Sequence, residues 1–156
     1  LNQFRKKYDY QYVDMSSEFV TAARAMQANW CNWRECDSDA ALANENQAIA
    51  MLLSHWDELD RIMGGCILVK GKMAAYAIGE CMDNTLVVHF EKGDTDYKGI
   101  YQAINQMFLE HTLADAVSGI RYVNREQDLG DMGLRRSKES YHPVEFLKKF
   151  KVKFHQ

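Results

Sequence analysis

The residues between Tyr122 and Phe146 are the richest part of this chain in groups that can do chemistry. They read YVNREQDLGDMGLRRSKESYHPVEF and place carboxylates, guanidinium groups, a lysine, a tyrosine and a histidine around two glycines. Such a mixture can supply general acids, general bases and cations that bind anions. A solvated connecting loop can have the same composition. The spacing of the polar residues along the predicted elements is therefore what bears on function.

Three polar side chains follow a strand predicted at residues 119–123. In open α/β sheets the ends of strands present side chains to a ligand cleft. Glu126 is the candidate general base that takes a proton from an attacking amine, and Asn124 and Asp128 are candidate substrate-binding residues. The alternative is turn formation, because Asn and Asp side chains bond their own backbone.

A short helix is predicted over residues 130–139, with cations near its C-terminal end, where they suit the helix dipole. Arg135 could hold a carboxylate or a phosphate in a two-pronged contact. His142 has an intrinsic pKa suited to proton transfer at neutral pH, although it could instead pack beside Pro143. The same alternative, a solvated cation at a helix end, applies to Lys138.

Three further carboxylates lie on otherwise apolar elements. Glu45 interrupts the apolar stripe of a predicted helix, and Glu80 and Glu91 lie near the ends of two successive predicted strands. If Glu80 and Glu91 face one another, the pKa of one should rise, which suits a base or a substrate-binding group. Pairing with Lys92 or an arginine is the alternative.

The elements that must position these residues follow from periodicity and turn signals. Two helices are expected at the start, then three antiparallel strands, a helix that begins near Gly99, a strand, the short helix and a last strand. A helix separates the third strand from the next, so these two strands should pair in parallel through a crossover. The prediction is an α/β (α+β) fold, a mixed and twisted sheet with helices on both faces. Predicted ranges are 17–30, 42–59, 66–69, 73–82, 85–90, 119–123, 130–139 and 146–154, and helical spacing from Ile100 to His111 predicts the crossover helix.

Composition limits the function classes. The net charge of −3 argues against bulk nucleic-acid binding, and residues 121–156 are locally basic, with nine Lys or Arg against five Asp or Glu. No transmembrane segment is expected. The four cysteines lack metal-site spacing, so we expect no metal, four thiols and a reducing, cytoplasmic setting.

Two longer motifs carry a family resemblance. The segments VVHFEKGDTDYKGIYQAINQMF and YVNREQDLGDMGLRRSKESYHP resemble a bacterial family of unknown function related to the C-terminal half of phosphatidylglycerol lysyltransferase. That half has a GNAT-like fold, and the short LRRSKESYHP is similar to the lysine-containing helix end of Fem-type transferases. The resemblance covers nearly the whole chain. It implies one GNAT-like domain over residues 1–156, the second lobe of a tandem protein, with the missing N-terminal lobe as its partner.

The resemblance also implies a reaction, which is transfer of an acyl or aminoacyl group to an amine or hydroxyl acceptor. Acyl-CoA or aminoacyl-tRNA would be the donor, bound near Lys98, Gly99 and Ile100 at the start of the crossover helix. Lys138 would stabilise developing charge and Tyr141 would protonate a leaving group. Asp94 and Asp96 depart from a glycine-rich pyrophosphate loop, because carboxylates repel a diphosphate. A non-catalytic lobe that binds a substrate or partner is the alternative function.

Overall fold

The computed structural model describes residues 2–115, 119–150 and 152–154, and the chain forms two compact units, residues 1–124 and 125–156. The expected single domain over the whole chain stays a prediction. The second unit contains α5 (Met132–Glu139). The helical segments of the first unit are α1 (Asn2–Lys7), α2 (Ser17–Arg34), η1 (Cys36–Ser38), α3 (Ala40–Ser54), η2 (Trp56–Glu58) and α4 (Ile100–Asp115). Its strands are β1 (Tyr10–Asp14), β2 (Ile62–Val69), β3 (Lys72–Met82), β4 (Thr85–Gly93) and β5 (Tyr122–Asn124).

The first unit is built on a five-stranded sheet in the order β1-β2-β3-β4-β5. The first four strands pair antiparallel, and β5 pairs with β4 in parallel. Helix α4 makes the crossover between these two strands, as the sequence predicts. Strand β1 and helix α1 were not predicted. The mixed sheet itself is confirmed.

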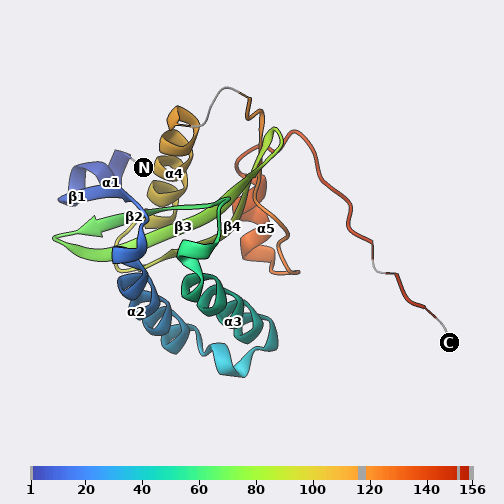
Figure 1. Cartoon of the computed structure of the whole chain (residues 1–156), viewed down its shortest axis with the longest axis horizontal. Coiled ribbons are helices and arrows are strands. Elements are labelled where there is room, and N and C mark those ends of the chain that lie inside the picture. The colour runs from blue at the N-terminus through green and yellow to red at the C-terminus, as the bar shows by residue number, and fades with distance from the viewer. Residues whose placement is uncertain (1, 116–118, 151, 155–156) are drawn as a thin grey trace. The chain divides into compact units, whose positions relative to one another are not determined.

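Helices cover both faces of this sheet (Figure 1). On one face α4 packs its buried residues, such as Ile104 and Phe108, against apolar side chains of β2, β3 and β4, and Phe4 of α1 joins this cluster. On the other face α2 and α3 contribute Met26 and Ile49. Strand side chains alternate between the faces, so one sheet supplies both clusters. The expected arrangement of helices on both faces is confirmed.

Two glycines, Gly64 and Gly65, lie inside β2, although the strand predicted over residues 66–69 leaves them out. A Cβ on Gly65 would lie 2.0 Å from the hydroxyl oxygen of Tyr12, and a Cβ on Gly64 would lie 3.0 Å from the carbonyl oxygen of Ala77. Glycine is required here by close approach, which is a common reason for glycine within strands. The predicted start of β2 at Cys66 is therefore wrong by four residues, since β2 begins at Ile62.

The cysteines also differ from expectation. Cys31 near the end of α2 and Cys36 in η1 form a disulfide, so the prediction of four thiols is wrong for this pair. Cys66 and Cys81 remain thiols. Cys66 is fully buried, and this burial together with Asp14 raises its pKa to about 12.

In the second unit, Asp131 caps α5 by accepting a hydrogen bond from the backbone N–H of Leu134 at 2.7 Å. The helix ends at Glu139, as predicted. The last predicted strand, over residues 146–154, is wrong within the described residues, because neither 146–150 nor 152–154 forms a strand. Its large apolar side chains, such as Phe150 and Phe154, are exposed, so they lack the packing that stabilises strand residues.

Within the described ranges, none of the helices combines the length and the apolar character needed to cross a membrane. The same described residues contain no group of three or more His, Cys, Asp or Glu side chains placed to hold a metal ion.

Candidate functional site

The parallel strands β4 and β5 pair over a short distance only. Their register consists of Thr85 with Tyr122, Leu86 with Val123 and Val87 with Asn124, while β4 continues to Gly93. Beyond Val87, strand β4 therefore runs on without β5 beside it. Strands that part in this way open a place for a ligand, whose polar groups can pair with the remaining backbone N–H and C=O groups. Asn124, a predicted substrate-binding residue, marks the point where the strands part.

On the α4 face of this part of β4, Glu91 meets Asn105. The side-chain amide of Asn105 donates to Oε2 of Glu91 at 3.1 Å, and Asn105 is 2% exposed. A buried amide at a fixed place orients the carboxylate. Glu91, a predicted substrate-binding residue, is thus held in one orientation on a half-buried part of β4.

On the face of α2 and α3, Lys92 forms a buried ion pair. Its side chain is 5% exposed, its Nζ lies 2.6 Å from Oε2 of Glu45, and it also lies 3.8 Å from the ring centroid of Trp30. Burial lowers the pKa of Lys92, and the ion pair with Glu45 opposes this shift. The ring nitrogen of Trp30 in turn donates to the hydroxyl of Tyr101 at 3.0 Å. This cluster joins α2, α3, β4 and α4.

In the turn before α4, two backbone N–H groups donate hydrogen bonds to side chains of the protein itself. The N–H of Asp96 donates to Oδ1 of Asp94 at 3.0 Å, and the N–H of Lys98 donates to the hydroxyl of Tyr8 at 3.1 Å. Gly99 has a φ of 86°, which suits glycine, and the side chain of Ile100 is buried in the core. Of the predicted donor-binding residues, only Lys98 has an exposed side chain.

Glu80 and Glu91 do not face one another. Glu80 pairs with Val87 in the sheet, and Glu91 pairs with Ala77. Glu80 instead lies 3.3 Å from Nε2 of His89. The hypothesis that these two carboxylates face one another is therefore wrong, because their positions along the β3–β4 hairpin differ.

In the second unit, Lys138 ties down the loop that holds Glu126. Its ammonium donates to the backbone carbonyls of Arg125 at 2.5 Å, Glu126 at 3.2 Å and Gln127 at 2.7 Å. Glu126 has a φ of 55° and Leu129 a φ of 52°, a conformation that costs a non-glycine residue about 1 kcal/mol or more. The lysine thus holds a loop whose backbone is strained.

Asp128 and Arg135 form an exposed ion pair beside this loop. Nε of Arg135 lies 2.5 Å from Oδ2 of Asp128, and the N–H of Gly130 donates to Oδ1 of Asp128 at 2.9 Å. The contact with Arg135 lowers the pKa of Asp128 to about 2. Both predicted substrate-binding residues are thus brought together, and each is a partner of the other.

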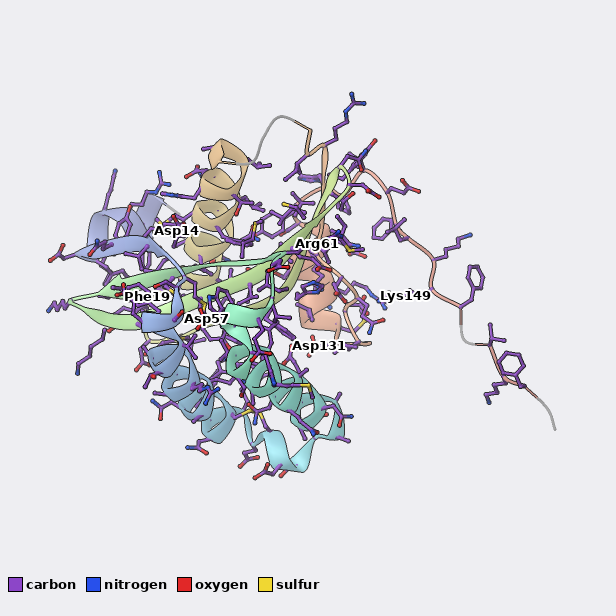
Figure 2. The ribbon with its side chains drawn as sticks, viewed as in Figure 1. Asp14, Phe19, Asp57, Arg61, Asp131 and Lys149 are labelled. Carbon is purple, nitrogen blue, oxygen red and sulfur yellow. A yellow bond between two sulfur atoms is a disulfide. The ribbon has the colours of Figure 1, made fainter. Side chains whose placement is uncertain are left out.

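Tyr141 and His142 follow α5. The guanidinium of Arg125 lies 4.3 Å from the ring centroid of Tyr141, a cation–π contact that fixes the ring. His142 has a φ of 52°, and its N–H donates to the carbonyl of Glu139 at 2.9 Å. Figure 2 labels Asp131, which precedes α5, and Lys149, which follows it in the chain. Nζ of Lys149 lies 3.8 Å from Oε2 of Glu126. Tyr141 and Lys149 thus contact Arg125 and Glu126, whereas His142 is bonded to the end of α5.

The sequence offers Lys92 as an alternative partner of the carboxylates, and the structure confirms this pairing for Glu45, a carboxylate on an apolar stripe. The sequence reasoning missed Trp30, which lies beside Lys92, and Asn105, which orients Glu91 on the other face of the sheet. Two hollows of about 270 and 340 Å³ in the described part of the chain are lined by none of the predicted site residues. The candidate site along β4 is therefore located by the strand register and the buried polar groups, and not by a hollow.

Comparison with known proteins decides the family. The model of the family described as phosphatidylglycerol lysyltransferase, C-terminal, matches residues 1–153. The chain belongs to this family. A conserved protein of unknown function from Bacteroides thetaiotaomicron has a similar structure, with 35% sequence identity and a TM-score of 0.85 over 92% of this chain. The match covers 48% of the Bacteroides protein, so this chain spans about half of its length. No curated protein matches the sequence.

Two acetyltransferase structures show the fold. A possible acetyltransferase from Clostridium difficile has a TM-score of 0.65 at 13% identity, over 94% of this chain and 99% of that chain. An aminoglycoside N-acetyltransferase in complex with CoA has a TM-score of 0.53 at 12% identity, over 96% of this chain and 95% of that chain. The GNAT-like fold implied by the resemblance is confirmed.

Proposed function

We propose that this lobe takes part in acyl or aminoacyl transfer to an amine or hydroxyl acceptor, with the donor bound along β4 between Val88 and Gly93. The observation that carries the proposal is the register of β4, which continues to Gly93 after β5 leaves it at Val87. Membership of the lysyltransferase C-terminal family and the GNAT-like fold support it. The oriented carboxylate of Glu91 then lies where a polar donor group would pass.

The donor that fits best is an aminoacyl ester, as in aminoacyl-tRNA. Coenzyme A brings a diphosphate, which needs free backbone N–H groups or cations at the start of α4. Here the N–H groups of Asp96 and Lys98 are bonded within the protein, and the Asp94 and Asp96 carboxylates would repel the diphosphate. No metal enters this scheme.

Glu126 remains the proposed general base, which takes the proton of an attacking amine as the new bond to the acyl carbon forms. Lys138 holds the backbone of this strained loop, and thereby the part of the chain that carries the carboxylate. We assign Lys138 to positioning this loop, because its ammonium already donates to three carbonyls of the loop. Tyr141 and His142 remain the proposed proton donors to the leaving group, and Asn124, Asp128 and Arg135 the proposed substrate contacts.

Single-turnover transfer by the complete protein tests these roles. Glu126→Gln should slow transfer by about 100-fold or more, the usual effect of losing a general base. Glu139→Gln is the matched control, because it makes the same change on α5, and it should leave the rate unchanged. Transfer by Glu126→Gln within about twofold of the unaltered protein would contradict the role of Glu126.

Lys138→Ala, with Arg136→Ala as control, separates positioning from charge stabilisation. If Lys138 positions the loop, Lys138→Ala should also speed amide hydrogen exchange at residues 126–130, and Arg136→Ala should not. Slow transfer with unchanged exchange would instead assign the ammonium to the reacting atoms.

The second candidate is a non-catalytic lobe that binds a substrate or a partner. Two sets of hydrogen bonds favour this candidate, because they engage groups that could otherwise contact a substrate. Lys138 donates to carbonyls of the neighbouring loop, and the N–H of Lys98 donates to Tyr8. Calorimetry on the complete protein with coenzyme A, and separately with an aminoacyl-tRNA mimic, distinguishes the two candidates. Binding of neither molecule would support the scaffold role.

A further inference from the structure

The C-terminal segment, defined here as Val144–Phe150 and Val152–Phe154, exposes large apolar side chains. Phe150 is 83% exposed and Phe154 is 91% exposed, and the other apolar residues of the segment are at least 70% exposed. The described residues of the segment form neither helix nor strand. An exposed apolar surface of this kind is uncommon unless another surface covers it.

The order of residues in the segment is that of a β-strand. In an extended chain, alternate residues point to opposite sides. One side then has Val144, Phe146, Phe150, Val152 and Phe154, with Lys148 between them, and the other side has Glu145, Leu147, Lys149 and Lys153. Such alternation is typical of a strand with one buried and one solvated face. β-Branched and aromatic residues favour strands for the same reason.

We propose that the C-terminal segment adds as a strand to the free edge of a sheet in the part of the complete protein that lies outside this chain. Two observations favour a sheet outside this chain as the binding partner of the segment. The family is a C-terminal one, and the Bacteroides relative has about as much protein again beyond the region that this chain matches. The backbone of the segment would pair with the sheet edge, and its phenylalanine side would cover apolar residues of that sheet. The lysines of the other side would stay in water.

This proposal does not depend on the transfer reaction, since a catalytic lobe and a scaffold lobe would both use such a contact. It assigns the segment a partner of defined chemistry, which is an open strand edge beside an apolar surface. Lysines on the solvated side would discourage pairing with further chains, a common protection of edge strands.

Hydrogen exchange of the complete protein tests the proposal. Amides of residues 145–150 and 152–154 that pair with a sheet edge should exchange at least 100-fold more slowly than unprotected peptide amides. Phe150→Ser with Phe154→Ser should remove most of this protection, because the strand loses its buried side chains. Lys153→Ser is the matched control on the solvated side and should change the protection less than twofold.

Chemical cross-linking from the amine of Lys153 identifies the surface that the C-terminal segment contacts. Links to residues outside the region matched by this chain support the proposal. Links confined to this same region, or links between two copies of the protein, would overturn it. Exchange of all segment amides at the unprotected rate would overturn it as well, and transfer activity can be measured separately in the same variants.

Discussion

The cluster around Lys92 and the loop around Glu126 use polar side chains in opposite ways. In the first unit, the ammonium of Lys92 is buried, and its partner Glu45 lies on another element. In the second unit, the Asp128–Arg135 pair is exposed, and both residues belong to the same short stretch of chain. Buried polar groups are costly unless they are paired, whereas exposed pairs contribute little. We therefore expect changes in the first cluster to affect stability and changes around the loop to affect local geometry and function.

Removing one partner of the buried ion pair should have the largest effect. Glu45→Leu leaves the Lys92 ammonium buried without its carboxylate, which should lower the free energy of unfolding by about 3 kcal/mol. Urea unfolding of the complete protein, followed by the fluorescence of its tryptophans, measures this loss. The double variant Glu45→Leu with Lys92→Met should recover much of it. A loss below about 1 kcal/mol in the single variant would contradict the account of this cluster.

Adding a side chain at Gly79 should cause the second-largest loss in the free energy of unfolding. A Cβ there would lie 2.4 Å from the carbonyl oxygen of Val87, so Gly79→Ala must push β3 and β4 apart. We expect a loss of about 2 kcal/mol in the free energy of unfolding, in the range found for overpacking. Gly71→Ala is the comparison, because its Cβ meets nothing within 4 Å and only its φ of 75° is unfavourable. Equal losses in the two variants would argue against the close approach at Gly79.

Tyr76 tests a smaller buried contact in the first unit. Its hydroxyl donates to Oε1 of Gln27 at 2.6 Å, and its side chain is fully buried. Tyr76→Phe leaves the Gln27 oxygen without this donor and should cost about 1 to 2 kcal/mol in urea unfolding. Tyr141→Phe in the second unit should lower the free energy of unfolding much less. An equal loss in the two variants would contradict the expected difference between the two regions.

The smallest effect is expected at the exposed ion pair, and it concerns pH. The pKa of Asp128 is lowered to about 2, so its contribution to stability is present above the ordinary carboxyl pKa of 3.8 and is lost as the pH falls toward 2. Arg135→Ala should move the pKa of Asp128 up toward 3.8 in an NMR titration. Arg136→Ala should not move it. An unchanged pKa in Arg135→Ala would show that Arg135 is not its cause.

The sequence predicts the layers of the fold better than the details of the site. The helical stripes and the crossover predict the mixed sheet, because these patterns reflect burial on repeated faces. Gly64 and Gly65 were placed outside β2, since a sequence does not show that Tyr12 lies over them. The sequence offers Lys92 or an arginine as a partner of Glu45, and only the fold decides between them, because Lys92 lies 47 residues from Glu45 in the chain. The carbonyl contacts of Lys138 depend on a loop conformation that residue types do not specify.

Mapping the donor on the strands tests the central proposal most directly. Amide hydrogen exchange of the complete protein is measured with and without a saturating aminoacyl-tRNA mimic. If the donor binds along β4, amides between Val88 and Gly93 should become protected, and amides of β1, the strand at the other edge of the sheet, should not. Saturable binding that leaves Val88–Gly93 unchanged, or no binding at all, would contradict the proposed donor site.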